Sequence, residues 1–275
     1  KFKKNTTVFG STNYKKKFDH NYINLKPKNN ILQSQNKKYV QEFKKYEIKK
    51  KSDLIEVHNR PSYIKYIQDL SKKTKLILYF HNDPLSMNGS KYAYERNFLL
   101  EKCEKIVFNS NWSKNRFINN LNLKNSYKNK ICIIHQSTKK NVINFYNKKK
   151  FITFVGKLNV NKGYDLFGEA IIKILNKYKD WTGLVAGDEA RDKIIFRHPR
   201  LKILGFQSHN KIIRLFKKTS ITVVCSRWDE PFGRVSLEAS ANGCAVIISN
   251  KGGLPETNKE AIVLKKLDVK NIYKE

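Results

Sequence analysis

The stretch ITVVCSRWDEPFGRVSLEASANGCAVIIS, residues 221–249, decides the fold of this chain. Ile221–Cys225 and Ala245–Ser249 are short, apolar and rich in β-branched residues, which favours buried strands. Between them, a turn containing Pro231 and Gly233 leads into Val235–Asn242, where the sequence predicts a helix. A strand, a helix and a strand in this order are typical of an α/β domain with a parallel sheet.

The same alternation extends outward through the rest of the chain. Upstream in the second half we predict the strands 151–155, 183–186 and 201–204 and the helices 164–178 and 210–217. In the first half, short apolar runs alternate with polar or helical stretches such as 39–50 and 92–103; the runs are 6–9, 54–57, 76–80, 106–108 and 131–134. This rhythm predicts two doubly wound parallel-sheet domains, which are Rossmann-like and face a cleft.

A length of 275 residues agrees with two domains. We place the first at 1–137 and the second at 151–275, joined by a linker at 138–150 that is rich in Lys and Asn. The chain opens on Lys1 without a signal-peptide pattern or an initiating Met, so we expect that its N-terminus is missing.

The chain is strongly basic, with a formal net charge of +33, and residues 1–150 contribute +24 of it. Codon bias toward Lys and Asn, which occur 47 and 30 times, is one explanation. Attraction to a polyanion, either a nucleic acid or an anionic membrane surface, is the other. No apolar run approaches the ~18 residues that cross a bilayer. Four scattered cysteines without a C-x-x-C pair indicate reduced thiols and a cytoplasmic protein.

Two loops that follow predicted strands carry charged residues suited to chemistry, because ligands of doubly wound sheets bind beyond the carboxyl ends of the strands. The first loop has Gly156, Lys157 and Lys162 before a helix, a setting that suits a diphosphate. The second has Glu230, and Glu238 follows in the next helix. These carboxylates could bind sugar and ribose hydroxyls. Solvated lysines, a surface acid and a helix-dipole partner are the alternatives.

Three ordered motifs resemble those of the family 4 retaining glycosyltransferases, of the glycosyltransferase group 1 type, which have the GT-B fold. Glu230 and Glu238 have the spacing of the family's E-x7-E signature. They lie within the sequences Glu-Pro-Phe-Gly and Leu-Glu-Ala, which the family usually has at these places. Residues 156–163 resemble its G-R-L…K-G phosphate loop, with Lys157 where the family usually has Arg. Residues 252–256 resemble its G-G-x-P-E turn. The resemblance further implies that the chain is a fragment, which lacks the first strand of the first domain and the end of the second domain.

The resemblance implies a role for each matching residue. Lys157 and Lys162, with Gly156, would hold the diphosphate of a nucleotide-sugar donor, and Glu238 would hold the ribose. Glu230 would be catalytic and would contact the transferred sugar together with the backbone around Phe232 and Gly233, and Arg234 would be a further residue that binds the nucleotide sugar. The sequence has no D-x-D, so we expect no metal and no cofactor beyond the nucleotide-diphosphate sugar as co-substrate.

In the first half, polar residues follow the ends of three predicted strands. We expect these residues to lie at the cleft. The loops of this half resemble the acceptor-side loops of the same family, where a His at a strand end often lies beside the reacting sugar. We place His81 nearest the chemistry as a second catalytic candidate, with His58 next to it. Arg60 and Asp83 are candidates for binding the acceptor. Structural roles stay open for all four residues.

The resemblance implies a hexosyltransferase-type enzyme. It would move a sugar from a nucleotide donor to a glycan or glycolipid acceptor in lipopolysaccharide or surface polysaccharide biosynthesis. We expect a peripheral membrane protein, cytoplasmic or at the inner face of the membrane. The alternatives are a nucleotide-sugar epimerase or phosphorylase on the same fold and, with less support, a basic nucleic-acid-binding protein.

Overall fold

The computed structural model describes residues 5–12, 21–26, 34–72, 74–139, 141–191 and 194–275. By their contacts these residues form two compact units. The first comprises Lys1–Val107 and Arg116–Cys132, and the second comprises Phe108–Asn115 and Ile133–Glu275. The domain boundaries predicted from the sequence, 1–137 and 151–275, stay a prediction.

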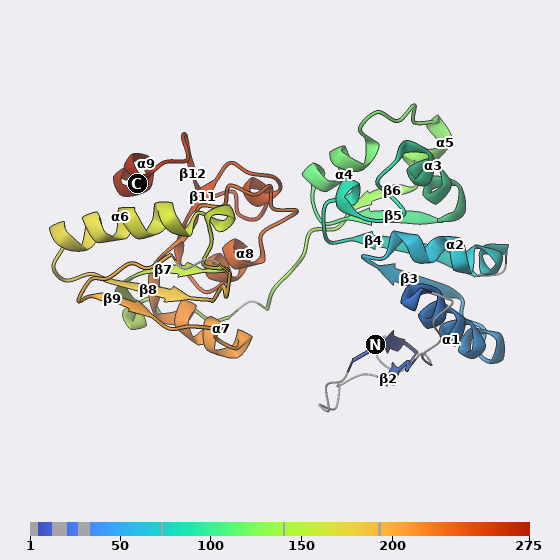
Figure 1. The fold of residues 1–275 in the computed structure, drawn as a ribbon, viewed down its shortest axis with the longest axis horizontal. Coiled ribbons are helices and arrows are strands. Elements are labelled where there is room, and N and C mark those ends of the chain that lie inside the picture. The colour runs from blue at the N-terminus through green and yellow to red at the C-terminus, as the bar shows by residue number, and fades with distance from the viewer. Residues whose placement is uncertain (1–4, 13–20, 27–33, 73, 140, 192–193) are drawn as a thin grey trace. The chain divides into compact units, whose positions relative to one another are not determined.

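The second unit is built on a six-stranded sheet with the order β12-β11-β10-β7-β8-β9 (Figure 1). All five strand pairs in it are parallel. The strands are β7 (Lys149–Val155), β8 (Thr182–Ala186), β9 (Leu201–Ile203), β10 (Thr219–Val224), β11 (Ala245–Ser249) and β12 (Ile262–Leu264). Because successive strands are parallel, their carboxyl ends and the loops that follow them share one edge of the sheet.

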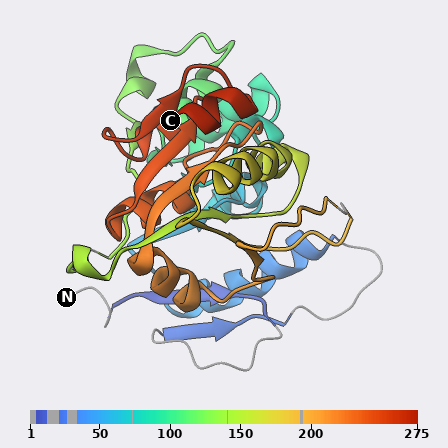
Figure 2. The same ribbon diagram turned by 90° about the vertical axis from the view of Figure 1, so that its left-hand side faces the viewer.

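Helices cover both faces of this sheet, as Figure 2 shows for α6 (Tyr164–Lys177) and α7 (His209–Lys218). On one face Ile152 and Phe154 of β7 pack with apolar side chains of α6 and with Ile272 of α9 (Val269–Lys274). On the other face Val246 and Ile248 of β11 pack with side chains of α7 and of α8 (Arg234–Ala241). The sheet is therefore doubly wound, as the continuous apolar strands predicted.

The first unit holds a four-stranded sheet with the order β3-β4-β5-β6 and a separate parallel pair of β1 (Thr7–Gly10) and β2 (Asn21–Asn24). The four strands are β3 (Leu54–His58), β4 (Lys75–Phe80), β5 (Lys105–Phe108) and β6 (Ile131–Ile133). Its helices are α1 (Gln35–Lys49), α2 (Ile64–Ile67), α3 (Ala93–Lys102) and α5 (Asn125–Lys128), and α4 (Asn111–Ile118) is divided between the two units at Asn115 and Arg116. Single 3-10 turns complete the two units: η2 (Pro61–Tyr63), η3 (Gln68–Lys72), η4 (Pro84–Ser86), η5 (Phe145–Asn147), η6 (Val160–Lys162) and η7 (Leu254–Glu256).

Burial alternates along β3 and β4, so each strand has one core face and one solvent face. Ile55 and Val57 of β3 are buried, and so are Leu78 and Phe80 of β4. The two strands pair in parallel with His58 opposite Tyr79, which puts both of these residues on the solvent face. Their ends lie at the carboxyl edge of the sheet.

The predicted elements match the observed ones, with boundaries shifted by up to four residues. The largest shift is at α1, which begins at Gln35 because the Ser34 side chain caps it by accepting from the amide of Lys37. The strand β7 begins at Lys149, inside the predicted linker, because Lys149 pairs with Thr219 of β10. This pairing depends on a residue 70 positions away, which a local pattern does not contain.

Candidate active site

Glu230 lies in the loop after β10, and its side chain is mostly buried. The Nζ atom of Lys162 forms an ion pair with its carboxylate. The backbone of Glu230 is held by the Gly-Gly turn, since the amide of Gly253 donates to its carbonyl at 2.6 Å. Gly252 has φ +60°, and a Cβ there would lie 2.2 Å from the Glu230 carbonyl oxygen, so the contact requires glycine. The predicted G-G-x-P-E turn thus positions a predicted catalytic carboxylate.

Glu238 is a buried carboxylate on α8, with only 6% of its side chain exposed. Arg234 Nη2 donates to its Oε1 at 2.5 Å, one helical turn away. His209 Nε2 lies 3.1 Å from the same oxygen. Arg234 was predicted as a donor-binding residue, whereas His209 was not. His209 comes from α7, 29 residues before Glu238, and no local sequence pattern links the two residues.

The lysine loop connects β7 to α6. Asn159 caps it, since its side-chain oxygen accepts from the amide of Lys162 at 3.1 Å. Gly163 has φ +72°, and a Cβ there would lie 1.9 Å from the carbonyl oxygen of Cys225. The close approach explains why glycine follows Lys162. Lys157 is exposed, and within the described residues its amine has no ion-pair partner.

An Arg–Asp pair ties the lysine loop and the start of α6 to the loop that carries Glu230. Arg227 binds Asp165 through two hydrogen bonds of 2.6 and 2.7 Å and also donates to the carbonyl of Val160 at 2.7 Å. The amides of Arg227 and Trp228 both donate to the carbonyl of Asn161. The sequence analysis missed this pair, because the two residues are 62 positions apart.

The electrostatics of this pair favour its charged form. Burial alone would raise the pKa of Asp165, but the hydrogen bonds and the charge of Arg227 outweigh burial and lower that pKa. The same hydrogen bond raises the pKa of Arg227, against the effect of burial. Both residues are therefore charged over the neutral pH range.

Phe232 and Gly233 complete the loop at the start of α8. The Phe232 ring is buried and stacks on His135 with ring centroids 5.6 Å apart. The Phe232 side chain therefore has a packing role. The backbone near the start of α8 is what remains to contact a ligand. Gly233 precedes the first turn of α8 and supplies no side-chain cap to it.

In the first unit, His58 and His81 are brought together at the carboxyl edge of the sheet. His58 Nδ1 lies 3.0 Å from His81 Nε2, and His58 Nε2 lies 3.4 Å from Glu56 Oε2. Burial lowers the pKa of His81, and the neighbouring His58 lowers it further. Glu56 was not among the predicted site residues.

The two predicted acceptor residues have structural partners in the first unit. Asp83 accepts from Arg116 at 2.8 and 3.2 Å, and it also accepts from the amide of Leu85 at 3.0 Å. Arg60 is exposed and donates to the carbonyl of Asn59 at 2.9 Å. Acceptor binding by these two residues stays a prediction.

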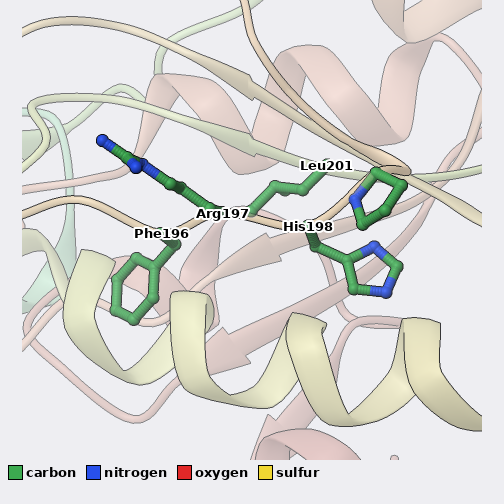
Figure 3. A pocket seen from close by; sticks show the side chains of 5 residues that line it. Phe196, Arg197, His198 and Leu201 are labelled. Atoms are coloured by element: carbon green, nitrogen blue, oxygen red, sulfur yellow. The ribbon is translucent and has the colours of Figure 1, made fainter.

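A hollow on the second unit lies elsewhere (Figure 3). It is lined by Phe196, Arg197, His198, Pro199 and Leu201, where β9 begins. This is the edge of the parallel sheet opposite to the one with the glutamates. Among the residues that the structure describes, no cluster of three His, Cys, Asp or Glu side chains could hold a metal ion. In the same part of the chain, every helix is too short or too polar to cross a membrane.

The chain is similar to several known proteins. Residues 116–271 match the family model for glycosyl transferases group 1. The putative glycosyltransferase YtcC of Bacillus subtilis strain 168 is 26% identical over 240 residues, which cover 76% of this chain and 58% of the relative. The lipopolysaccharide core biosynthesis mannosyltransferase LpsB of Rhizobium meliloti strain 1021 is 30% identical over 118 residues, which cover 39% of this chain and 33% of that protein.

Among solved structures, the crystal structure of Anabaena HepE in complex with UDP superposes with a TM-score of 0.69 at 17% identity. The match covers 86% of this chain and 70% of that one. This likeness confirms the predicted α/β fold of the GT-B class. The chain spans less than two thirds of the length of the two sequence relatives.

Proposed function

The chain belongs to the glycosyl transferases group 1 family, and we propose that it is a glycosyltransferase that uses a nucleoside-diphosphate sugar as its donor. The transfer retains the anomeric configuration, needs no metal ion and delivers the sugar to a glycan or glycolipid. Surface polysaccharide synthesis, including that of lipopolysaccharide, is the setting we propose.

The ion pair between Lys162 and Glu230 carries the donor proposal. Breaking a glycosyl–phosphate bond moves negative charge onto the leaving diphosphate, and a fixed lysine stabilises that charge. The sugar on the other side of the same bond gains positive charge, which a carboxylate stabilises. Because Lys162 and Glu230 are in contact, one glycosyl–phosphate bond can reach both side chains.

Glu238 supports the nucleotide end of the same donor. A buried carboxylate accepts several hydrogen bonds, and Arg234 and His209 fix its Oε1. Two neighbouring ribose hydroxyls are the donors that suit its remaining capacity. The proposed order along the donor is therefore ribose at Glu238, diphosphate at Lys157 and Lys162, and sugar at Glu230.

The experiment is a transfer assay on the chain and on its Glu230→Gln variant. Glutamine keeps the shape of the side chain but removes its charge, so we expect at least a tenfold loss in kcat with the fold intact. Glu260→Gln, an exposed glutamate of the same unit, is the matched control and should transfer like the parent.

Two further arms of the assay test the rest of the proposal. Activity should persist in excess EDTA, and the anomeric configuration of the product should equal that of the donor. Near-normal turnover by Glu230→Gln would contradict the role of Glu230. Loss of activity in EDTA that Mn²⁺ or Mg²⁺ restores would contradict metal independence.

A further inference from the structure

Four polar or aromatic side chains cluster on the solvent face of the sheet in the first unit. Glu56 and His58 alternate on β3, and Tyr79 and His81 come from β4 and the residue after it. The register places His58 directly opposite Tyr79, so all four residues belong to one face. The rings of His58 and Tyr79 stack with centroids 4.6 Å apart.

Three of these residues form a continuous chain of hydrogen-bonding groups. The chain runs from the Glu56 carboxylate to His58 Nε2 over 3.4 Å, and from His58 Nδ1 to His81 Nε2 over 3.0 Å. The two imidazole rings are nearly parallel, with 5° between their planes. Each contact uses a different ring nitrogen of His58, so His58 links Glu56 to His81.

The backbone around His81 is held by a separate contact. Asn59, in the left-handed region with φ 57°, directs its side-chain oxygen to the amides of His81 and Asn82 at 3.2 and 3.1 Å. This contact fixes the segment that carries His81 against the end of β3. The backbone of His81 is therefore restrained where its ring contacts His58.

The chemistry of the chain selects one tautomer for each neutral ring. A carboxylate only accepts hydrogen bonds, so His58 must donate to Glu56 through Nε2–H. A neutral His58 then has an unprotonated Nδ1, which must accept from His81 Nε2–H. A neutral His81 is left with an unprotonated Nδ1, which is a hydrogen-bond acceptor.

We propose that Glu56 and His58 are positioning residues that hold His81 as its Nε2–H tautomer. His81 Nδ1 then accepts a hydrogen bond from a hydroxyl group of the carbohydrate. The same nitrogen cannot donate to a phosphate or carbonyl oxygen, which defines the group that His81 binds. The contact with carbohydrate rests on the proposed function, whereas the tautomer rests on the geometry of this chain alone.

The surroundings of His81 favour a neutral ring. Burial raises the pKa of Tyr79, and its charge interaction and hydrogen bond with Glu56 raise it further, so this phenol stays neutral. The pKa of His81 is lowered by burial and by His58, which favours its neutral form. Glu56 is thus the charged group that orients the chain.

The tautomer can be measured by nitrogen-15 NMR of the full chain at pH 8, above the ordinary histidine pKa of about 6.5. Two-bond correlations from the ring nitrogens to the ring C–H protons distinguish the tautomers, and His81→Gln assigns the signals among the six histidines of the chain. We expect a single Nε2–H form for His81. Glu56→Met should give a mixture, and Glu56→Gln, whose amide oxygen still accepts, should keep most of that form.

Transfer kinetics test the consequence for activity. Glu56→Met should lower kcat about threefold to tenfold, and Glu56→Gln should restore most of it. Glu101→Met, which changes an exposed glutamate on α3 of the same unit, should affect neither kcat nor the spectrum.

Three outcomes would overturn the inference. An Nδ1–H form of His81 in the parent chain would overturn the tautomer, and so would an unchanged tautomer in Glu56→Met. Unchanged kcat in Glu56→Met would overturn the positioning role. If the parent chain transfers no sugar, the proposed function fails, and the NMR measurement still decides the tautomer.

Discussion

At the scale of single residues, Glu238 shows how burial gives a carboxylate a defined task. Only 6% of its side chain is exposed, and Arg234 and His209 both contact its Oε1. An unpaired buried carboxylate would be costly, and these two contacts pair and orient it. The E-x7-E spacing could be read from the sequence, but the contribution of His209 could not, because α7 and α8 are brought together only by the fold.

Glu238→Gln should reduce discrimination between a nucleoside diphosphate and its 2′,3′-dideoxy analogue. The parent chain should prefer the ribose form roughly tenfold or more, since a hydrogen bond to a charged group contributes about 1.5–3 kcal/mol. The variant should bind both ligands with similar affinity. Isothermal titration of both ligands to both proteins measures this, and an undiminished preference in Glu238→Gln would place the ribose elsewhere.

At the scale of elements, the sequence predicted what is encoded locally. Apolar, β-branched runs identified the strands of both sheets except β12, because a strand that is buried on one or both faces needs apolar residues. The helices α1, α3, α6, α7 and α8 were predicted from stretches between the strands, whereas α2, α4, α5 and α9 were not. Gly163 and Gly252 belong to predicted motifs whose backbone geometry requires glycine. Contacts between loops, such as that of Arg227 with Asp165, depend on how far apart the strand ends lie in three dimensions. A local sequence pattern does not indicate that distance.

The Arg227–Asp165 pair predicts a pH-dependent contribution to stability. The pKa of Asp165 is lowered in the folded chain, so its contribution is present above the ordinary Asp value of about 3.9. It is lost as the pH falls through the lowered pKa. Asp165→Asn should therefore lower Tm by about 2–4 °C at pH 7, for a loss of about 1 kcal/mol. The difference from the parent should shrink as the pH approaches 3.

Thermal unfolding of the two proteins at a series of pH values tests this. Asp180→Asn is the control, because Asp180 and its partner Lys150 form an ion pair that is well exposed at the surface, and such pairs contribute little to stability. A deficit in Asp165→Asn that is constant from pH 7 to pH 3 would show that lost packing, rather than lost charge, accounts for it.

At the scale of the whole molecule, the charge of +33 has two explanations, a docking surface or codon bias, and vesicle binding distinguishes them. If the first half binds membranes, the chain should co-sediment with vesicles containing anionic lipid at 0.1 M salt and be released at 1 M, where the Debye length is about 3 Å. Exchanging Lys37, Lys49 and Lys51, exposed in and just after α1, for glutamine should weaken binding by about 1 kcal/mol per lysine.

A matched triple variant in the second unit is the control for this experiment. Lys173, Lys202 and Lys211 are also exposed, and exchanging them for glutamine should change vesicle binding much less. Equal losses in the two variants, or no binding by the parent, would leave codon bias as the sufficient explanation of the charge.

The central claim is that the loops after β7 and β10 bind a nucleoside diphosphate, and calorimetric titration of the full chain with UDP, GDP and ADP tests it most directly. We predict that at least one of these ligands binds and that the double variant Lys157→Ala and Lys162→Ala loses at least tenfold in affinity for it, because charge-assisted contacts to phosphate are removed. The double variant Lys202→Ala and Lys211→Ala is the control and should bind the nucleotide like the parent. Binding of none of the three nucleotides, or equal binding by the Lys157 and Lys162 variant, would contradict the claim.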